Sequence, residues 1–187
     1  MVKRKYLTLG EIRRMIKSVN SGVTGARDSC LILLTFRHGF RISEILNLRF
    51  HDLNIEERRV CINRLKNGFS TVHPIHKDEL IFLKKWFSVR RKWKSATESD
   101  RIFISIRGTP LSRSQAWRII RLSGELSGIA VGTHPHMLRH ACGYELAERG
   151  TDTRLIQDYL GHKNIRHTVL YTASNAERFT RLWGRKK

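Results

Sequence analysis

The chain has 187 residues, of which 36 are Lys or Arg and 16 are Asp or Glu, so its formal net charge is +20. A hydrophobic fraction of 40% and four tryptophans argue against an intrinsically disordered chain and are typical of a folded domain. A surface this basic repels itself, so we expect a polyanionic partner, and nucleic acid rather than an anionic membrane. The apolar runs are too short to cross a bilayer, and the first residues lack the apolar segment of a signal peptide.

The three cysteines, Cys30, Cys61 and Cys142, stand far apart in apolar surroundings. An odd number with this spacing predicts reduced thiols in the protein core rather than a disulfide framework or a zinc site. Together with the basic charge, this pattern predicts a cytoplasmic protein associated with the nucleoid.

The first part of the chain has a helical pattern. "TLGE" at residues 8–11 is a capping-box sequence, and apolar residues follow it at helical spacing. Residues 25–37 predict a second, largely buried helix. After the turn "HGF", the segment "RISEILNLRF" predicts a third helix with Arg41 near its beginning.

The pattern then changes to a β-hairpin. The β-prone runs "RVCINRL" and "FSTVHPI" flank an Asn-Gly dipeptide, which is the strongest short hairpin signal. Lys66 is therefore expected at or beside the turn. Residues 77–94 predict a helix, and "RIFIS" predicts a short strand.

The remainder of the chain is predicted to be helical in pieces, with glycines as the helix ends. The expected helices are one that ends near Gly128 and three at roughly 136–149, 152–160 and 164–173. The predicted fold class is mainly α (α+β), a helical domain with one small antiparallel β-sheet. We expect a single domain over residues 1–187, with an N-terminal helix or arm at 1–20 and a basic tail at 173–187.

The segment "KKWFSVRRKWK" at residues 84–94 carries six positive charges, no acid and three aromatic rings. It is either the DNA-facing end of a helix, with cations on phosphates, or a solvated helix face whose rings lie in the core. On the first interpretation the DNA-binding residues are Lys84, Lys85, Arg90, Arg91, Lys92 and Lys94.

The tail segment "ERFTRLWGRKK" has five Lys or Arg against one Glu. It either contacts DNA or docks on another subunit through Phe179, Leu182 and Trp183. The second interpretation is favoured, because large apolar side chains at an exposed terminus need a partner to cover them.

Six side chains in chain order have the chemistry for cleaving a phosphodiester without a metal. Two guanidiniums can clamp the non-bridging oxygens of the phosphate as they gain charge. A phenol can attack phosphorus and remain as a covalent ester. A histidine can accept the phenolic proton, and a lysine can donate a proton to the leaving oxygen. The candidates are Arg41, Lys66, His136, Arg139, His162 and Tyr171.

Each candidate has a simpler interpretation when it is taken alone. Arg41 suits an ordinary surface arginine, and Lys66 suits a turn lysine. The histidines of "HPHMLRH" suggest a metal site, but the proline interrupts the run and no carboxylate or Cys ligand is nearby. Tyr159 competes with Tyr171 as the nucleophile, although it lies in an amphipathic segment and is expected to pack in the interior. The order of all six residues is therefore the stronger signal.

That order resembles the tyrosine recombinase, or phage integrase, family. The pattern is an arginine, a hairpin lysine, H-x-x-R, G-H, and a tyrosine nine positions after that last histidine. The similar stretch "HPHMLRHACGYELAERGTDTRLIQDYLGHKNIRHTVLYT" is almost unbroken, and the segments around Arg41 and Lys66 extend it over most of the chain.

The resemblance implies a role for each residue. Arg41 and Arg139 would bind the scissile phosphate, and Lys66 would be the general acid for the 5′ oxygen. Glu44 matches an acidic position of the family near the first arginine and would give structural support.

For the remaining positions, His136 would assist proton transfer, and His162 would hydrogen-bond the phosphate. Tyr171 would form a 3′-phosphotyrosyl bond. The implied fold is the helical catalytic domain of the family.

The resemblance also implies the partners. Members of the family act as homo-tetramers on double-stranded DNA with inverted-repeat sites, without metal, ATP or any other cofactor. The short chain and "TASNAERF" after the tyrosine are similar to the small invertases that flip fimbrial promoter elements in enteric bacteria. A separate N-terminal core-binding domain is not expected here, so host DNA-bending proteins or tetramer contacts would help to clamp the duplex.

Two other functions fit parts of the pattern. A type IB topoisomerase-like enzyme would use the same chemistry to nick and reseal DNA without exchange. A basic DNA-binding transcriptional regulator would keep the fold alone, although a binder has no need for the tyrosine or for His162.

Overall fold

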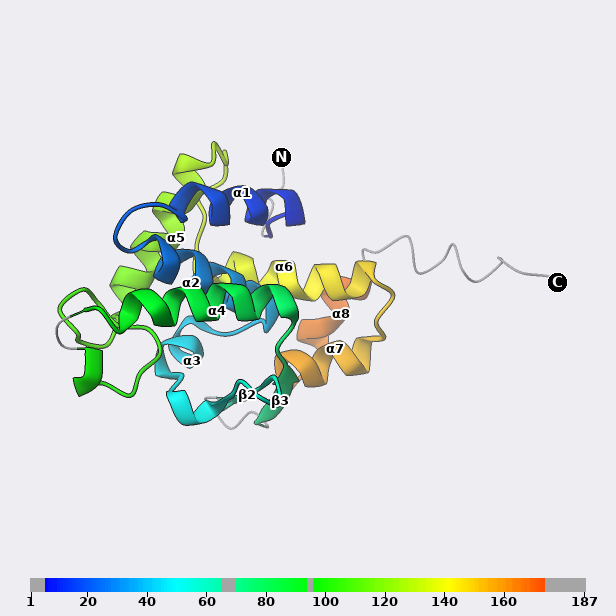
Figure 1. Ribbon diagram of the computed structural model, residues 1–187. Coiled ribbons are helices and arrows are strands. Elements are labelled where there is room, and N and C mark those ends of the chain that lie inside the picture. Colours follow the sequence, from blue (N-terminus) through cyan, green and yellow to red (C-terminus); the bar gives the residue numbers. More distant parts are fainter. Residues whose placement is uncertain (1–5, 65–69, 94–95, 174–187) are drawn as a thin grey trace.

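A computed structural model describes residues 6–64, 70–93 and 96–173 of the chain. Within these residues the fold consists of eight α-helices and one small three-stranded sheet, which confirms the mainly α (α+β) prediction (Figure 1). The helices are α1 Leu9–Val19, α2 Gly25–Arg37, α3 Ile42–Asn47, α4 Lys77–Arg90, α5 Arg113–Leu126, α6 Pro135–Glu148, α7 Thr153–Leu160 and α8 Arg166–Ala173. The strands are β1 Leu53–Asn54, β2 Arg59–Ile62 and β3 Thr71–Pro74, and short 3-10 turns cover Phe50–Asp52 and Ala96–Glu98.

The capping box predicted for the first helix is confirmed. The Glu11 amide donates to the Thr8 hydroxyl at 3.3 Å, and the Thr8 amide donates to the Glu11 carboxylate at 2.8 Å. These two bonds satisfy amides that have no partner inside the helix, and so they fix where α1 begins.

Helix α2 is the central element of the molecule. Every residue from Gly25 to Phe36 is buried, as expected for a helix that packs on all sides. Leu31 and Leu34 join the apolar cluster that includes the sheet and α4, whereas Ile32 and Phe36 join the cluster around α1 and α6. The two halves of the core therefore meet at α2, between α1, α4 and α6 (Figure 1).

The sheet is antiparallel in the order β1-β2-β3, which confirms the predicted hairpin, while its turn lies outside the described residues. Strand β1 was not predicted. Along β2, Val60 and Ile62 point into the core and Cys61 points to solvent. The prediction that all three cysteines are core thiols is therefore wrong for Cys61. Side chains along a strand point alternately to the two faces of the sheet, which puts Cys61 on the outer face.

Two segments differ from the sequence predictions. The segment "RIFIS" is not a strand: it forms only isolated bridges, Arg49 with Arg101 and Ile104 with Pro110. Its apolar residues, 102–104, are fully buried, so they behave as core and not as part of a ladder. Helix α4 ends at Arg90 rather than near residue 94.

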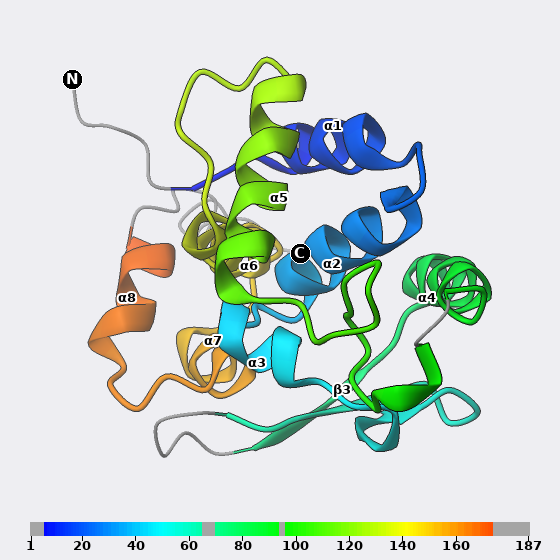
Figure 2. The same ribbon diagram turned by 90° about the vertical axis from the view of Figure 1, so that its left-hand side faces the viewer.

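The segments that carry the candidate residues gather on one side of the fold. Helices α6, α7 and α8 contact one another, and α3 lies next to α6 and α7 in Figure 2, with the hairpin strands beneath them. Among the described helices, none is both long and apolar enough to cross a membrane.

Candidate active site

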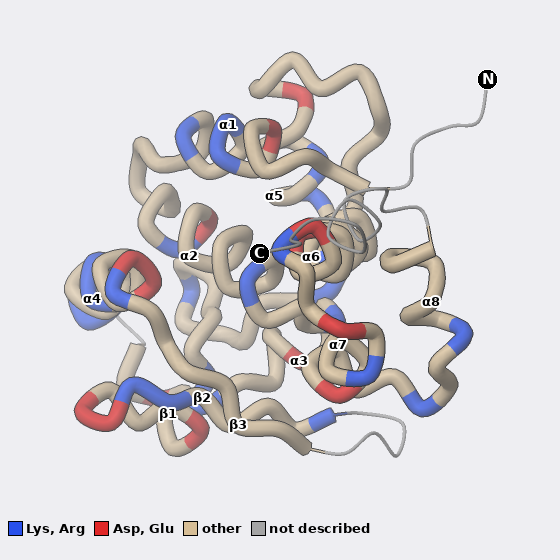
Figure 3. Tube along the Cα trace, turned by 90° about the vertical axis from the view of Figure 1, so that its right-hand side faces the viewer, with Lys and Arg blue, Asp and Glu red and all other residues tan. Residues whose placement is uncertain are grey.

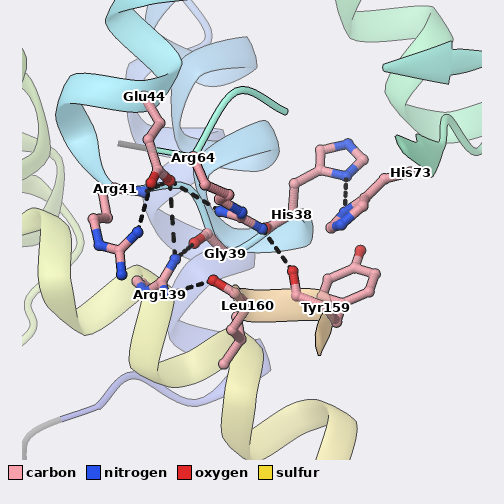
Figure 4. Close-up of polar contacts among 9 residues, drawn as sticks. All are labelled: His38, Gly39, Arg41, Glu44, Arg64, His73, Arg139, Tyr159 and Leu160. Carbon is pink, nitrogen blue, oxygen red and sulfur yellow. Dashed lines mark hydrogen bonds and ion pairs between the residues drawn. The ribbon is translucent and has the colours of Figure 1, made fainter. Parts of the chain in front are cut away.

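Glu44 is the centre of a buried polar network (Figure 4). Arg41 is the N-cap of α3; its amide donates to Glu44 Oε2 at 2.8 Å, and its Nη1 donates to Oε1 at 2.6 Å. Burial alone would raise the pKa of the Glu44 carboxyl, but the Arg41 amide and the charges of Arg64 and Arg41 outweigh it and lower that pKa. Glu44 is thus a carboxylate that holds the neighbouring Arg41 side chain in place.

Arg139 is buried on α6 and is held by two backbone carbonyls. Its Nη1 donates to the Gly39 carbonyl, its Nη2 donates to the Leu160 carbonyl at 2.7 Å, and Nη1 lies 4.0 Å from Glu44 Oε2. Gly39 has a φ of +57°, and a Cβ there would meet Leu160 Cδ2 at 2.3 Å, so only glycine lets the turn come this close. Burial and the charges of Arg41 and Arg64 lower the pKa of Arg139 to about 10, which leaves it protonated at neutral pH.

The histidines of the motif lie around these arginines. His136, in the first turn of α6, keeps an exposed side chain, and partial desolvation and the charges of His134, Arg139 and Arg41 lower its pKa. His162 follows Gly161, the left-handed C-cap of α7, and its Nδ1 lies 2.9 Å from the Thr168 hydroxyl.

Helix α8 begins at Arg166, so His162 lies in the connection between α7 and α8. It is half-buried, and burial and the charges of Arg139 and Arg41 lower its pKa to about 3. The ring is therefore neutral at physiological pH and acts as a hydrogen-bonding group rather than as a cation.

Tyr171 is buried on α8, with 2% of its surface exposed. Its Oη lies 3.0 Å from His140 Nδ1, and its ring packs edge-on against Tyr144 and lies 6.2 Å from the His162 ring. A Cβ at Gly143 would fall 2.5 Å from a Tyr171 ring carbon, so glycine on α6 makes room for the ring. Burial raises the pKa of Tyr171 to about 12, although the charge of Arg139 opposes the rise. The phenol is therefore protonated at neutral pH.

Tyr159, the rival nucleophile, packs in the interior as predicted. Its hydroxyl donates to the Arg37 carbonyl at 2.9 Å, and its ring stacks on His73 at 3.9 Å between centroids. Burial raises its pKa well above the ordinary value. Its hydroxyl is bonded to a main-chain carbonyl, whereas the Tyr171 hydroxyl lies beside a histidine ring and under the charge of Arg139, which favours Tyr171 for the reaction.

The structure brings five of the six candidates into one neighbourhood, held by α3, α6, α7 and α8. Arg139 electrostatically affects His136, His162 and Tyr171, and it shares the Glu44 carboxylate with Arg41. The sixth candidate, Lys66, lies between β2 and β3, outside the described residues.

Two residues of this site were missed in the sequence. Arg64 donates to Glu44, and His140 contacts the Tyr171 hydroxyl. A signal for Arg64 was available: the alternation of Val60 and Ile62 on β2, continued by two residues, points Arg64 inward. His140 has no such local signal, because its contact depends on the packing of α8 against α6.

The basic segment around α4 is mostly a solvated face. Lys and Arg also occur on other elements, such as α1 and β2, and so are not confined to α4 (Figure 3). Lys94 lies outside the described residues, and those of the candidate DNA contacts that are exposed are Lys84, Lys85, Arg91 and Lys92. Arg90 is different and corrects the prediction: it is buried, and its Nη2 donates to the carbonyls of Ser99 and Arg101 at 2.7 and 2.8 Å, so it is not available to a duplex.

Comparisons with known proteins identify relatives of this chain. The chain is 63% identical to the type 1 fimbriae regulatory protein FimE of Escherichia coli K12 over 99% of this chain and 93% of the relative. It is 52% identical to the type 1 fimbriae regulatory protein FimB of the same strain, over 99% of this chain and 92% of the relative.

Solved structures support the same fold. A crystal structure of XerA recombinase matches with a TM-score of 0.81 at 25% identity, over 95% of this chain and 63% of that chain. The XerH site-specific recombinase bound to palindromic difH substrate, in a post-cleavage complex, matches with a TM-score of 0.80 at 22% identity, over 95% of this chain and 52% of that chain. Because the sequence profile of the phage integrase family matches residues 5–178, the chain belongs to that family and is a tyrosine-type site-specific recombinase.

Proposed function

We propose that this recombinase cleaves and rejoins DNA through a 3′-phosphotyrosyl bond and thereby inverts a promoter element that controls fimbrial phase variation. The observation that carries the proposal is that Arg139 shares the buried Glu44 carboxylate with Arg41 and also acts electrostatically on the Tyr171 phenol. A protein that only binds DNA has no use for a buried phenol within the electrostatic influence of a fixed arginine.

The two guanidiniums are suited to the scissile phosphate. Arg139 is held by the Gly39 and Leu160 carbonyls, and Arg41 is held by Glu44, so neither has to reorganise when an anion arrives. Fixed donors in a partly desolvated site stabilise the charge that develops on phosphorus oxygens far more than mobile surface cations do. His162, neutral at pH 7, adds a hydrogen bond to the same phosphate.

In the proposed reaction the Tyr171 oxygen attacks phosphorus, a new bond forms between Oη and phosphorus, and the bond to the 5′ oxygen breaks. The phenolic proton leaves as attack proceeds, with His136 assisting its transfer, and Lys66 gives a proton to the 5′ oxygen. The ester keeps the energy of the broken bond, so a 5′ hydroxyl can reverse the step without any cofactor.

The DNA partner is supported by a basic cavity beside the site. A cavity of about 420 Å³ opens next to His136, and its lining includes Arg113, Arg118 and Trp117. We propose that the protein acts as a homo-tetramer on double-stranded DNA with inverted-repeat sites, aided by host DNA-bending proteins, in the cytoplasm at the nucleoid.

The fimbrial assignment is supported by the identity to FimE and FimB over nearly their whole length. We extend it to the finer proposal that the switched operon encodes MR/P fimbriae, on the resemblance of "TASNAERF" after Tyr171 to the small fimbrial invertases. Expression of the protein beside a plasmid-borne MR/P promoter element should invert that element, and a matched type 1 promoter element identifies which substrate is preferred.

The chemistry is tested with a nicked suicide substrate, on which the covalent protein–DNA adduct accumulates. Tyr171→Phe should abolish the adduct and leave DNA binding unchanged, whereas the matched control Tyr159→Phe should still form it. Peptide mapping of the wild-type adduct should identify Tyr171. Adduct at normal yield from Tyr171→Phe would show that another residue is the nucleophile. Formation of Holliday junctions from two intact sites would distinguish strand exchange from simple nicking and resealing.

A further inference from the structure

Arg64 is a buried charge that the catalytic motif does not include. It lies two residues beyond β2, and its side chain is 0% exposed. A charge removed from water is strongly destabilising unless it is paired and hydrogen-bonded. Arg64 has such partners: Nη1 donates to Glu44 Oε2 at 2.9 Å, and Nη2 donates to the Tyr159 carbonyl at 2.6 Å (Figure 4).

These contacts connect three segments of the active site. Through Glu44, Arg64 reaches α3 and Arg41; through the Tyr159 carbonyl it reaches the last turn of α7. It also packs against the turn that leads to His162, because a Cβ at Gly161 would lie only 3.0 Å from Arg64 Nε and 3.1 Å from its Cδ.

The charges of this cluster have a simple balance. Arg41, Arg64 and Arg139 contribute three positive charges and Glu44 one negative charge, so the cluster keeps two positive charges for an anion. Without Arg64 the sum falls to one, and the Glu44 carboxylate has only the two phosphate-binding arginines as partners. In a buried site that carboxylate would then compete with the phosphate for both guanidiniums.

We propose that Arg64 is a positioning residue of the cleavage reaction: it shares the charge of Glu44 with Arg41, so that the donors of Arg41 and Arg139 that Glu44 and the carbonyls do not occupy stay available to the scissile phosphate. This inference rests on the proposed function and deepens it. Arg64 does not touch DNA or the reacting atoms, so its effect lies on the rate of cleavage and not on the affinity for DNA.

The test uses the full chain and a suicide substrate under single-turnover conditions, with protein in excess over DNA and at a concentration that saturates the DNA. The rate constant of adduct formation then does not depend on the fraction of active protein. Arg64→Met should lower that rate constant about 10²-fold, the size typical of losing one aligned electrostatic element. The dissociation constant for the same DNA should change less than about threefold, because a fully buried residue contacts no phosphate.

The decisive variant is the double substitution Arg64→Met with Glu44→Gln. A neutral amide at position 44 needs no counter-ion, and replacing both members of a buried pair avoids the isolated charge that one replacement leaves. The double variant should therefore cleave at least tenfold faster than Arg64→Met. Arg64→Lys, which keeps the charge but not the planar fork, should fall between Arg64→Met and the wild type.

Arg90→Met is the matched control, since Arg90 is also buried and also bonded to two carbonyls, but outside this cluster. It should lower the melting temperature without changing the cleavage rate constant. The inference is overturned by an unchanged rate in Arg64→Met, by a double variant no faster than Arg64→Met, or by a DNA affinity that falls as much as the rate. If Arg64→Met does not fold, the neutral variant Arg64→Gln replaces it, and Glu44→Gln is again expected to restore the cleavage rate because the pair then leaves no isolated charge. A wild-type protein that forms no adduct would contradict the proposed function itself and is thereby distinguished from a failure of Arg64.

Discussion

Two sets of cations in this molecule differ in how firmly the fold holds them. In the active site, Arg64 and Arg139 are buried and donate to a carboxylate or to backbone carbonyls. On α4 and just beyond its end, residues such as Lys84 and Arg91 are exposed to solvent. Fixed charges in a desolvated pocket act strongly on a bound phosphate, whereas exposed ones are screened by water and salt. The fold therefore separates cations for chemistry from cations for the general attraction of DNA.

The same contrast occurs between neighbours in the sequence. Arg90 is buried, its guanidinium lies 4.8 Å from the Phe50 ring, and it bonds two carbonyls, while Arg91 is exposed. One has a structural role and the other is free to meet a polyanion. Charge in a sequence run thus does not distinguish the two roles, because burial decides which role an arginine has.

The largest effect is expected from a substitution that keeps the positive charge at position 139 but removes the guanidinium hydrogen bonds. Arg139→Lys retains a cation but cannot donate to the Gly39 and Leu160 carbonyls and to a phosphate at once. The rate constant of adduct formation on the suicide substrate should fall by roughly 10²- to 10³-fold. The affinity for DNA should change only slightly, because one phosphate contact among many is altered. A rate within tenfold of the wild type would mean that charge alone suffices in the pocket.

A second, smaller effect is expected at the contact between His140 and the Tyr171 hydroxyl. His140→Leu removes the ring nitrogen that lies 3.0 Å from a buried hydroxyl, so the free energy of unfolding should fall by about 1–3 kcal/mol. Urea unfolding of His140→Leu, Tyr171→Phe and the double variant gives the coupling energy, which should be about 1 kcal/mol. A coupling energy near zero would show that the pair contributes no specific bond.

Local signals in the sequence were enough for much of the fold. The capping box at Thr8 and Glu11 and the buried helix at 25–37 depend on neighbours within a few residues, and both are confirmed. The "RIFIS" segment shows where this fails: its β-prone residues became core, and in the part of the chain that the structure describes they form isolated bridges rather than a β-ladder. A ladder requires a partner that the local pattern does not reveal.

The residues of the site likewise divide into those that the sequence motif identified and those that only the packing of the fold identifies. The chain order of the motif grouped Arg41 with Arg139, and both lie at Glu44 in the structure, while the roles of the six residues stay predictions. The roles of Arg64 and His140 depend on partners far away in the chain, with Tyr159 95 positions from Arg64 and Tyr171 31 from His140. Such pairs follow from helix packing, and no spacing rule within one element predicts them.

The smallest expected effect concerns the exposed cations, whose contact with DNA remains a prediction. The double variant Arg91→Gln/Lys92→Gln should leave the cleavage rate constant at saturating DNA within about twofold of the wild type. If both side chains meet phosphates, the slope of log affinity against log salt should become less steep by roughly 0.9 for each lost contact. The matched control Arg13→Gln/Arg14→Gln removes two exposed charges from α1. Equal changes in slope for the two variants would mean that α4 acts only through the overall charge of the protein, whereas a larger change for the α4 variant assigns that face to the duplex.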